Sequence, residues 1–180
     1  IATLSLNPSK NEFLAKNGSL LPHYNKRLED LESLNVSSFE EFTDTHVDRI
    51  YQSCLGYFSK PGANPYNIWF SRMESLIKAS LNMSYYDGSC CHLDIVQWAT
   101  NPVWRGLPNE SIQEMLEADL PFLKKLISNS QIELILINGK TTLSEFKKLF
   151  GDNIISGEDF ILAIDENPAN RLKMQHGKLI

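Results

Sequence analysis

The sequence has 180 residues, of which 22 are acidic, 17 are basic and 42% are apolar, and its net charge is −5. This composition is ordinary for a globular protein and excludes a disordered or fibrous chain. The acidic balance argues against a protein that coats nucleic acid by electrostatics alone, although an enzyme with a local basic rim remains compatible with it. We expect one domain spanning residues 1–180, because a chain of this size can bury most of its apolar surface in a single core.

The cysteines and the apolar runs indicate the compartment. Cys54, Cys90 and Cys91 are an odd set without the C-x-x-C spacing of a zinc site, which is typical of reduced thiols in an intracellular protein of the cytoplasm or nucleus. No apolar run approaches the roughly 20 residues that cross a bilayer, so we expect no membrane partner. Ile1 stands inside an expected strand, and we therefore expect the domain to be incomplete at both ends.

The first half of the chain predicts one strand and two helices. Residues 1–6 are apolar and β-branched, as in a buried strand, and Asn7-Pro8 ends it. Ser38 and Glu41 form a capping box ahead of an apolar stripe over residues 39–58, which predicts an amphipathic helix with that stripe buried. A second helix is expected after Asn64-Pro65.

The second half alternates strands and helices. Strands are expected over 91–97 and 132–137, with a weaker one at 160–164. Between the first two lies a helix that Pro121 should kink or split. This order predicts a three-layer α/β/α fold around a four-stranded, mainly parallel sheet. In such a sheet the functional groups lie beyond the carboxyl ends of the strands, here at residues 7–9, 94–98 and 138–139.

Several familiar motifs are missing. Leu134 stands where a phosphate-binding loop ending at Gly139-Lys140 needs its first glycine, and no G-x-G-x-x-G or G-x-S-x-G occurs. The four histidines are not spaced as metal ligands. We therefore expect neither a metal nor a cofactor.

Two stretches carry a family resemblance. The run from Leu6 to Ser9 is a strand end with an amide followed by proline. The segment from His92 to Thr142 contains, in order, a strand, a proline-rich loop, a helix and a strand that ends in Asn138-Gly139. In this order of parts the chain resembles the uracil-DNA glycosylase superfamily, whose members flip a base out of DNA and hydrolyse its N-glycosidic bond.

The resemblance implies roles for particular residues. Asn7 would orient the attacking water through its side-chain carbonyl; the alternative is that Asn7 only caps the turn. His176, near the end of the chain, would donate to the departing base, although the proline that usually follows such a histidine is absent. Phe13 would stack on the extruded base, with Tyr66 as the alternative, and either ring could instead belong to the core.

Asp94 departs from the family pattern, because the family commonly has an asparagine there that reads the base edge. Three readings stay open: a protonated Asp94 that imitates the amide, an ionised Asp94 that accepts from an exocyclic amine, or an Asp94 tied to Arg105 or to backbone amides without a base role. We favour the third, since it requires no unusual pKa.

The remaining candidates would contact nucleic acid. They are Ser9, Trp98, Arg105 and Asn138. For the loop after the second strand the plain alternative is a tryptophan that folds over the end of the sheet and contacts no nucleic acid. The sequence thus favours a monomeric DNA glycosylase-like hydrolase that acts on a modified or mispaired base. The alternatives are a non-catalytic module of the same fold that binds nucleic acid or protein, and a small-molecule enzyme that uses the same strand ends.

Overall fold

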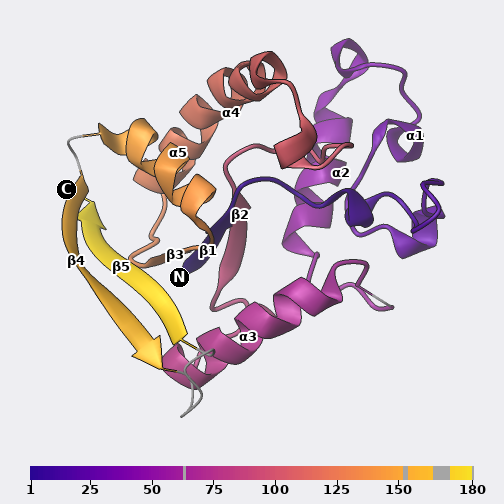
Figure 1. Ribbon diagram of the computed structural model, residues 1–180. Coiled ribbons are helices and arrows are strands. Elements are labelled where there is room, and N and C mark those ends of the chain that lie inside the picture. Colours follow the sequence, from indigo (N-terminus) through magenta and orange to yellow (C-terminus); the bar gives the residue numbers. More distant parts are fainter. Residues whose placement is uncertain (63, 152–153, 164–170, 180) are drawn as a thin grey trace.

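The central sheet has three parallel strands, β1 (Ala2–Ser5), β2 (Cys91–Asp94) and β3 (Ile135–Ile137). Their order is β2-β1-β3, so the first strand of the chain is the middle one, as the computed structural model shows (Figure 1). It describes residues 1–62, 64–151, 154–163 and 171–179. The α/β class and the parallel pairing of the three expected strands are thereby confirmed.

One face of the sheet packs against two helices. Leu4 pairs in register with Leu93 and Ile137, and all three join the cluster formed with α4 (Asn109–Ser128) and α5 (Lys140–Phe150). Leu4 is fully buried and Leu123 of α4 is 1% exposed. Burying a leucine side chain this completely stabilises a fold by roughly 1.5–3 kcal/mol. This face is therefore a main source of stability.

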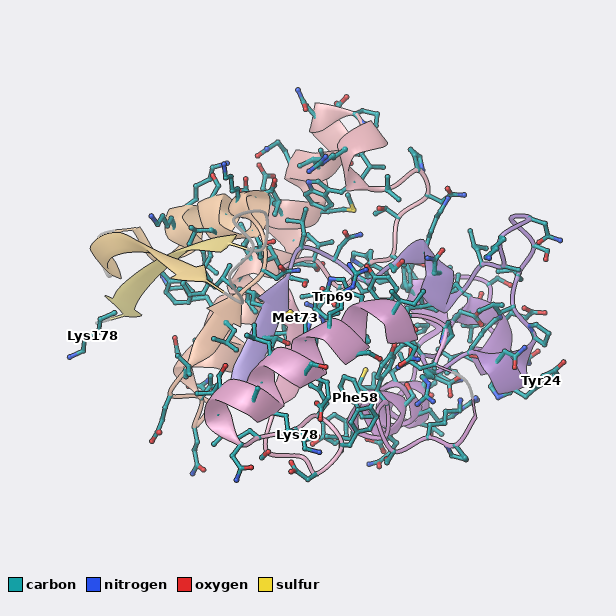
Figure 2. The ribbon with its side chains drawn as sticks, turned by 60° about the horizontal axis from the view of Figure 1, so that its bottom comes forward. Tyr24, Phe58, Trp69, Met73, Lys78 and Lys178 are labelled. Carbon is teal, nitrogen blue, oxygen red and sulfur yellow. The ribbon has the colours of Figure 1, made fainter. Side chains whose placement is uncertain are left out.

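The other face packs against α3 (Asn67–Leu81). Thr3 pairs in register with His92 and Leu136, and because side chains alternate along a strand these three point away from α4 and α5. Phe70 and Ile77 of α3 are buried in the cluster on this side. Figure 2 shows Trp69 and Met73 along α3, and both pack against the same cluster. Helices thus cover both faces.

Between β1 and α3, the residues that the structure describes form several short elements and one longer helix. They are η1 (Lys10–Glu12), η2 (His23–Asn25), α1 (Leu31–Leu34), η3 (Phe39–Glu41) and α2 (Asp44–Leu55). A further turn, η4 (Trp104–Gly106), precedes α4. Tyr24 of η2 is 78% exposed, at the end of the molecule opposite to Lys178 in Figure 2.

The expected fourth strand does not extend the central sheet. It forms as β4 (Ile154–Ala163), which pairs antiparallel with β5 (Arg171–Leu179) in a separate two-stranded sheet. Within the described residues the parallel sheet therefore has three strands. A hairpin partner that follows closely in sequence competes with the parallel crossover, because antiparallel neighbours need only a short connection. Residue 164, in the expected strand, lies outside the described residues.

Two helix expectations also need correction. The expected helix over 39–58 begins only at Asp44, because Thr43 and His46 form the capping box there, whereas Ser38 caps only the short turn η3 and makes no side-chain cap hydrogen bond. The α2 stripe is not buried, since Tyr51 is 58% exposed. Helix α4 continues through Pro121 and is not split. None of the helices in the described part of the chain combines the length and apolarity needed to span a membrane.

Candidate functional site

The three strand ends meet at one edge of the sheet. Ser5 pairs in register with Asp94, the last residue of β2, and the backbone N–H of Asn138 donates to the carbonyl of Leu4 at 2.9 Å. Beyond the strands, the Val96 N–H donates to the Leu6 carbonyl at 2.9 Å, which extends the β1–β2 pairing up to Asn7. The sequence placed these groups at a common edge, and the structure brings them there, with Asp94 and Asn138 on opposite sides of β1.

Asn7 is held by the loop that follows β2. Its amide nitrogen Nδ2 donates to the Trp98 carbonyl at 3.0 Å and lies 3.2 Å from Thr100 Oγ1, to which it also donates. That loop is in turn fixed by Asp119 of α4, whose carboxylate accepts from the Gln97 N–H at 2.6 Å. Because the amide donors are engaged, the orientation of the side chain is set, and its remaining polar atom is the carbonyl oxygen Oδ1.

Asp94 projects to the α3 side of the sheet, where it is 14% exposed. Its ion-pair partner is His92, which lies two residues earlier on the same face of β2 and whose Nε2 is 3.5 Å away. Arg105 is not the partner; it is exposed on η4. The Asp94 atom in the contact with His92 is Oδ1, and the distance is too long for a hydrogen bond, so this buried oxygen faces the imidazole without a hydrogen-bond partner. The favoured sequence interpretation, a carboxylate satisfied by Arg105 or by backbone amides, is therefore not what the structure shows.

A hydrogen-bond chain fixes His92. Thr3 Oγ1 lies 2.8 Å from His92 Nδ1 and 2.7 Å from the Tyr85 hydroxyl, deep in the sheet. One assignment of protons satisfies the whole chain: Tyr85 donates to Thr3, and Thr3 donates to Nδ1 of the ring. The other ring nitrogen of His92 then carries its proton toward Asp94. Trp69 and Phe70 of α3 pack edge-on against the ring.

Glu12 is the most unusual group at this edge. It ends η1, whose turn is capped by Ser9 Oγ accepting from the Asn11 N–H, and it is only 3% exposed. The Tyr57 hydroxyl donates to Glu12 Oε1 at 2.5 Å, while Oε2 has no hydrogen-bond partner. Burial raises the pKa of Glu12 to about 7, against the opposing effects of Tyr57 and Arg27, and nearby Asp94 raises it further. A carboxyl group of this kind can hold or release a proton near neutral pH.

Tyr66 completes the cluster that we call the β1–β2 site: Glu12, Tyr66, His92 and Asp94. Tyr66 is half-buried before α3 and stacks on Trp69, with ring centroids 5.9 Å apart. Burial raises the pKa of Tyr66, the Ser9 side chain beside its hydroxyl opposes this, and Asp94 and Glu12 lie near enough to raise it. Tyr66 therefore lies within electrostatic range of both carboxyl groups, whereas the other stacking candidate, Phe13, is half-buried directly after η1.

Three of the predicted nucleic-acid contacts, Trp98, Arg105 and Asn138, are exposed. Trp98 is 43% exposed and packs on Phe39 of η3, with ring centroids 4.7 Å apart, so that the loop holding Asn7 carries an exposed aromatic pair. Trp104, by contrast, belongs to the core on the α4 side, as the plain alternative for this loop predicts.

His176 is not among the residues that the parallel sheet brings together. It lies in β5, in the hairpin that occupies the left of Figure 1, whereas the chain leaving β1 runs to the right, toward α2. The His176 side chain lies outside what the structure describes, and its catalytic role stays a prediction.

Sequence reasoning missed Glu12, His92 and Tyr57. A signal existed for His92, since polar residues two apart in a strand share a face, and His92 and Asp94 interrupt an otherwise apolar run. No periodicity marks Glu12, because a single turn in a loop has no repeating buried face; its burial depends on a tyrosine 45 residues away.

Within the described residues, no group of three or more His, Cys, Asp or Glu side chains is arranged to hold a metal ion. Comparison with protein-family models, with curated proteins and with solved structures found no match to this chain. The site must therefore be interpreted from its own chemistry.

Proposed function

We propose that the protein is a DNA glycosylase-like hydrolase, which cleaves the N-glycosidic bond of a modified or mispaired base at the carboxyl edge of β1 and β2. The observation that carries this proposal is the meeting, at one edge, of an immobilised Asn7 and a half-buried Asp94, whose Oδ1 lies 3.5 Å from His92 Nε2 and makes no hydrogen bond. Buried carboxylate oxygens are normally satisfied. A buried carboxylate oxygen without a hydrogen bond, at the same edge as an oriented amide, is typical of a ligand-binding site.

The chemistry required by such a reaction matches these groups. The transition state at the sugar C1′ resembles an oxocarbenium ion, so the site needs an oriented water and fixed negative charge close by. Asn7 Oδ1 accepts a hydrogen bond from the water and directs its oxygen at C1′. As an amide it abstracts little of the proton, and the Asp94 carboxylate supplies the charge. On this proposal Asp94 also meets the edge of the extruded base.

The surroundings suit an extruded nucleotide. Tyr66 presents a half-buried ring to the base, with Phe13 as the alternative, and Ser9 stands beside it. The exposed Trp98 and Arg105 would contact the DNA strand on one side and Asn138 on the other. On this proposal the protein acts as a monomer on DNA inside the cell, in the cytoplasm or nucleus.

A second candidate is a non-catalytic nucleic-acid-binding module of the same fold. The exposed Phe39–Trp98 pair favours it, because stacking of bases on aromatic rings requires no chemistry at the strand edge. The two candidates differ in one result: only the hydrolase releases a free base.

The test is a panel of single-stranded and duplex oligonucleotides, each with one altered base, incubated with excess protein and assayed for free base and alkali-labile sites. We expect release from at least one substrate, reduced by orders of magnitude in Asn7→Ala. Asn129→Ala, at the exposed end of α4, is the matched control and should match the wild type. Binding of the oligonucleotides without release of any base would favour the binding module instead.

A further inference from the structure

Two buried carboxyl oxygens without hydrogen-bond partners belong to one cluster. Glu12 is 3% exposed and its Oε2 makes no hydrogen bond; Asp94 is 14% exposed, and its Oδ1 makes no hydrogen bond although it lies 3.5 Å from His92 Nε2. Glu12 and Asp94 interact electrostatically, as does Tyr66 with both of them. Orphaned polar atoms this deeply buried are uncommon, and two in one cluster indicate a ligand that offers complementary polar groups.

We propose that Glu12 and Asp94 together recognise a nucleobase edge with an acceptor ring nitrogen beside an exocyclic amine, and that Glu12 passes its proton to that nitrogen as the glycosidic bond breaks. The inference rests on the proposed function and names its substrate class: bases with a cytosine-type or adenine-type edge. Protonated Glu12 donates from Oε2 to the ring nitrogen, and Asp94 Oδ1 accepts from the amine.

The geometry separates the roles of the two carboxyl oxygens of Glu12. Tyr57 donates to Oε1 at 2.5 Å, which occupies that oxygen as an acceptor and leaves Oε2 for the proton. Arg27 holds Tyr57 in place, because its guanidinium donates to the Tyr57 carbonyl and stacks over the ring, 5.7 Å from the centroid. The proton-carrying oxygen therefore has a fixed orientation.

The same pair disfavours uracil. Uracil presents an N–H and a carbonyl at the corresponding edge, so the Asp94 carboxylate would face the carbonyl oxygen and the Glu12 proton would face the N–H. Donors would meet donors and acceptors would meet acceptors. Each mismatched group would stay buried without a hydrogen bond, so uracil should bind more weakly than a base that presents an exocyclic amine.

The transfer balances in atoms and charge. Glu12 gives its proton to the ring nitrogen, the C1′–N bond breaks, and its electron pair stays with the base, which leaves as a neutral molecule. Water adds its oxygen to C1′, and the proton that it loses returns to the Glu12 carboxylate. The net reaction is hydrolysis, with no oxidant and no second reactant.

Burial sets the pH range in which Glu12 carries a proton, and its charged and titratable neighbours adjust that range. The titratable and charged groups that face it are Tyr57, Arg27, Asp94, His92 and Tyr66. Desolvation is the dominant effect, and it raises the pKa of Glu12 to about 7. The excision rate should therefore be highest below about pH 7 and fall as the pH rises through that value.

Two variants separate binding from proton transfer. In Glu12→Gln the amide oxygen still accepts from Tyr57 and the amide N–H₂ still donates to the ring nitrogen, but no proton can be transferred. In Asp94→Asn the acceptor for the amine becomes a donor. Glu114→Gln, an exposed glutamate on α4, is the matched control.

The measurements are single-turnover excision across pH, far-UV circular dichroism of each variant, and calorimetric binding of free cytosine, adenine and uracil. We expect Glu12→Gln to keep the preference for amino bases, while excision falls roughly 10²–10⁴-fold and the fall in rate above about pH 7 disappears. Asp94→Asn should shift binding toward uracil. Glu114→Gln should match the wild type in every assay.

The outcomes separate this inference from the proposed function. Excision that is indifferent to the exocyclic amine, or that survives in Glu12→Gln with an unchanged pH profile, overturns the inference and leaves the glycosylase proposal standing. Binding of cytosine or adenine without excision of any base overturns the glycosylase proposal and the role of Glu12 as proton donor. That result supports only the recognition of amino bases by Glu12 and Asp94. If a variant loses its circular dichroism signal, the wild-type preference among the three free bases decides, and a preference for uracil contradicts the inference.

Discussion

The titration of Glu12 predicts how the stability of the fold depends on pH. The pKa of the Glu12 carboxyl group rises from 4.5 in the unfolded chain to about 7 in the folded protein. The folded protein therefore binds this proton more tightly than the unfolded chain does. The contribution of Glu12 to stability is fully present below about pH 4.5 and is lost as the pH rises to about 7. Each pKa unit is worth about 1.4 kcal/mol, so the free energy of unfolding should fall by about 3 kcal/mol across this range.

Replacing Glu12 by glutamine isolates this effect. The amide can still accept from the Tyr57 hydroxyl, yet it does not titrate, so the stability of Glu12→Gln should lack this loss. Urea unfolding from about pH 4.5 to about pH 8 gives the difference in free energy between wild type and variant at each pH, in which the other titrating groups largely cancel. The difference should move by about 3 kcal/mol in favour of the variant as the pH rises. Parallel curves for the two proteins would refute the assignment of a raised pKa to Glu12.

The remaining predictions concern the core, the hydrogen-bond chain and Asn7. Leu123→Ala, at a position 1% exposed, should lower the free energy of unfolding by about 2–5 kcal/mol in urea titrations, and a loss below 1 kcal/mol would contradict the core assignment. Thr3→Val leaves His92 Nδ1 and the Tyr85 hydroxyl without their shared partner; we expect the free energy of unfolding to fall by about 1–3 kcal/mol and the NMR chemical shifts of the His92 ring nitrogens to change, and unchanged ring shifts would argue against the hydrogen-bond chain. Asn7→Ala should leave the melting temperature within a few degrees of wild type while it removes excision, and a collapse of the fold would mean that Asn7 is structural.

The parallel core of the fold could be predicted because its signals are local and repeated. The apolar runs of residues 1–6, 91–97 and 132–137, separated by helical segments, admit few arrangements other than parallel strands, and the structure has them. The hairpin of β4 and β5 could not be separated from a fourth parallel strand, because an apolar run does not specify its pairing partner. The start of α2 was misplaced because Ser38 and Thr43 are both good helix caps, and only tertiary context selects one of them.

The sequence predicted the strand-end residues of the candidate site but not the partners that surround them. Asn7, Asp94 and Asn138 follow from the rule for strand ends, since each comes directly after or at the end of a parallel strand. The partner of Asp94 did not follow, because His92 is selected by side-chain direction on the strand and Arg105 only by nearness in sequence. Glu12 could not be found, because its burial depends on Tyr57, which follows α2 and lies 45 residues further along the chain.

Hydrolysis of the glycosidic bond is the central claim, and the fate of the water oxygen tests it directly. Wild-type protein in excess should be incubated in isotopically labelled water with duplexes that carry one mispaired cytosine-type, adenine-type or uracil base, and the products analysed by mass spectrometry. We expect the free base unlabelled, and one labelled oxygen at C1′ of the abasic sugar, with both products lost in Asn7→Ala. Intact oligonucleotide for every base, under conditions in which the protein binds the duplex, would contradict the account.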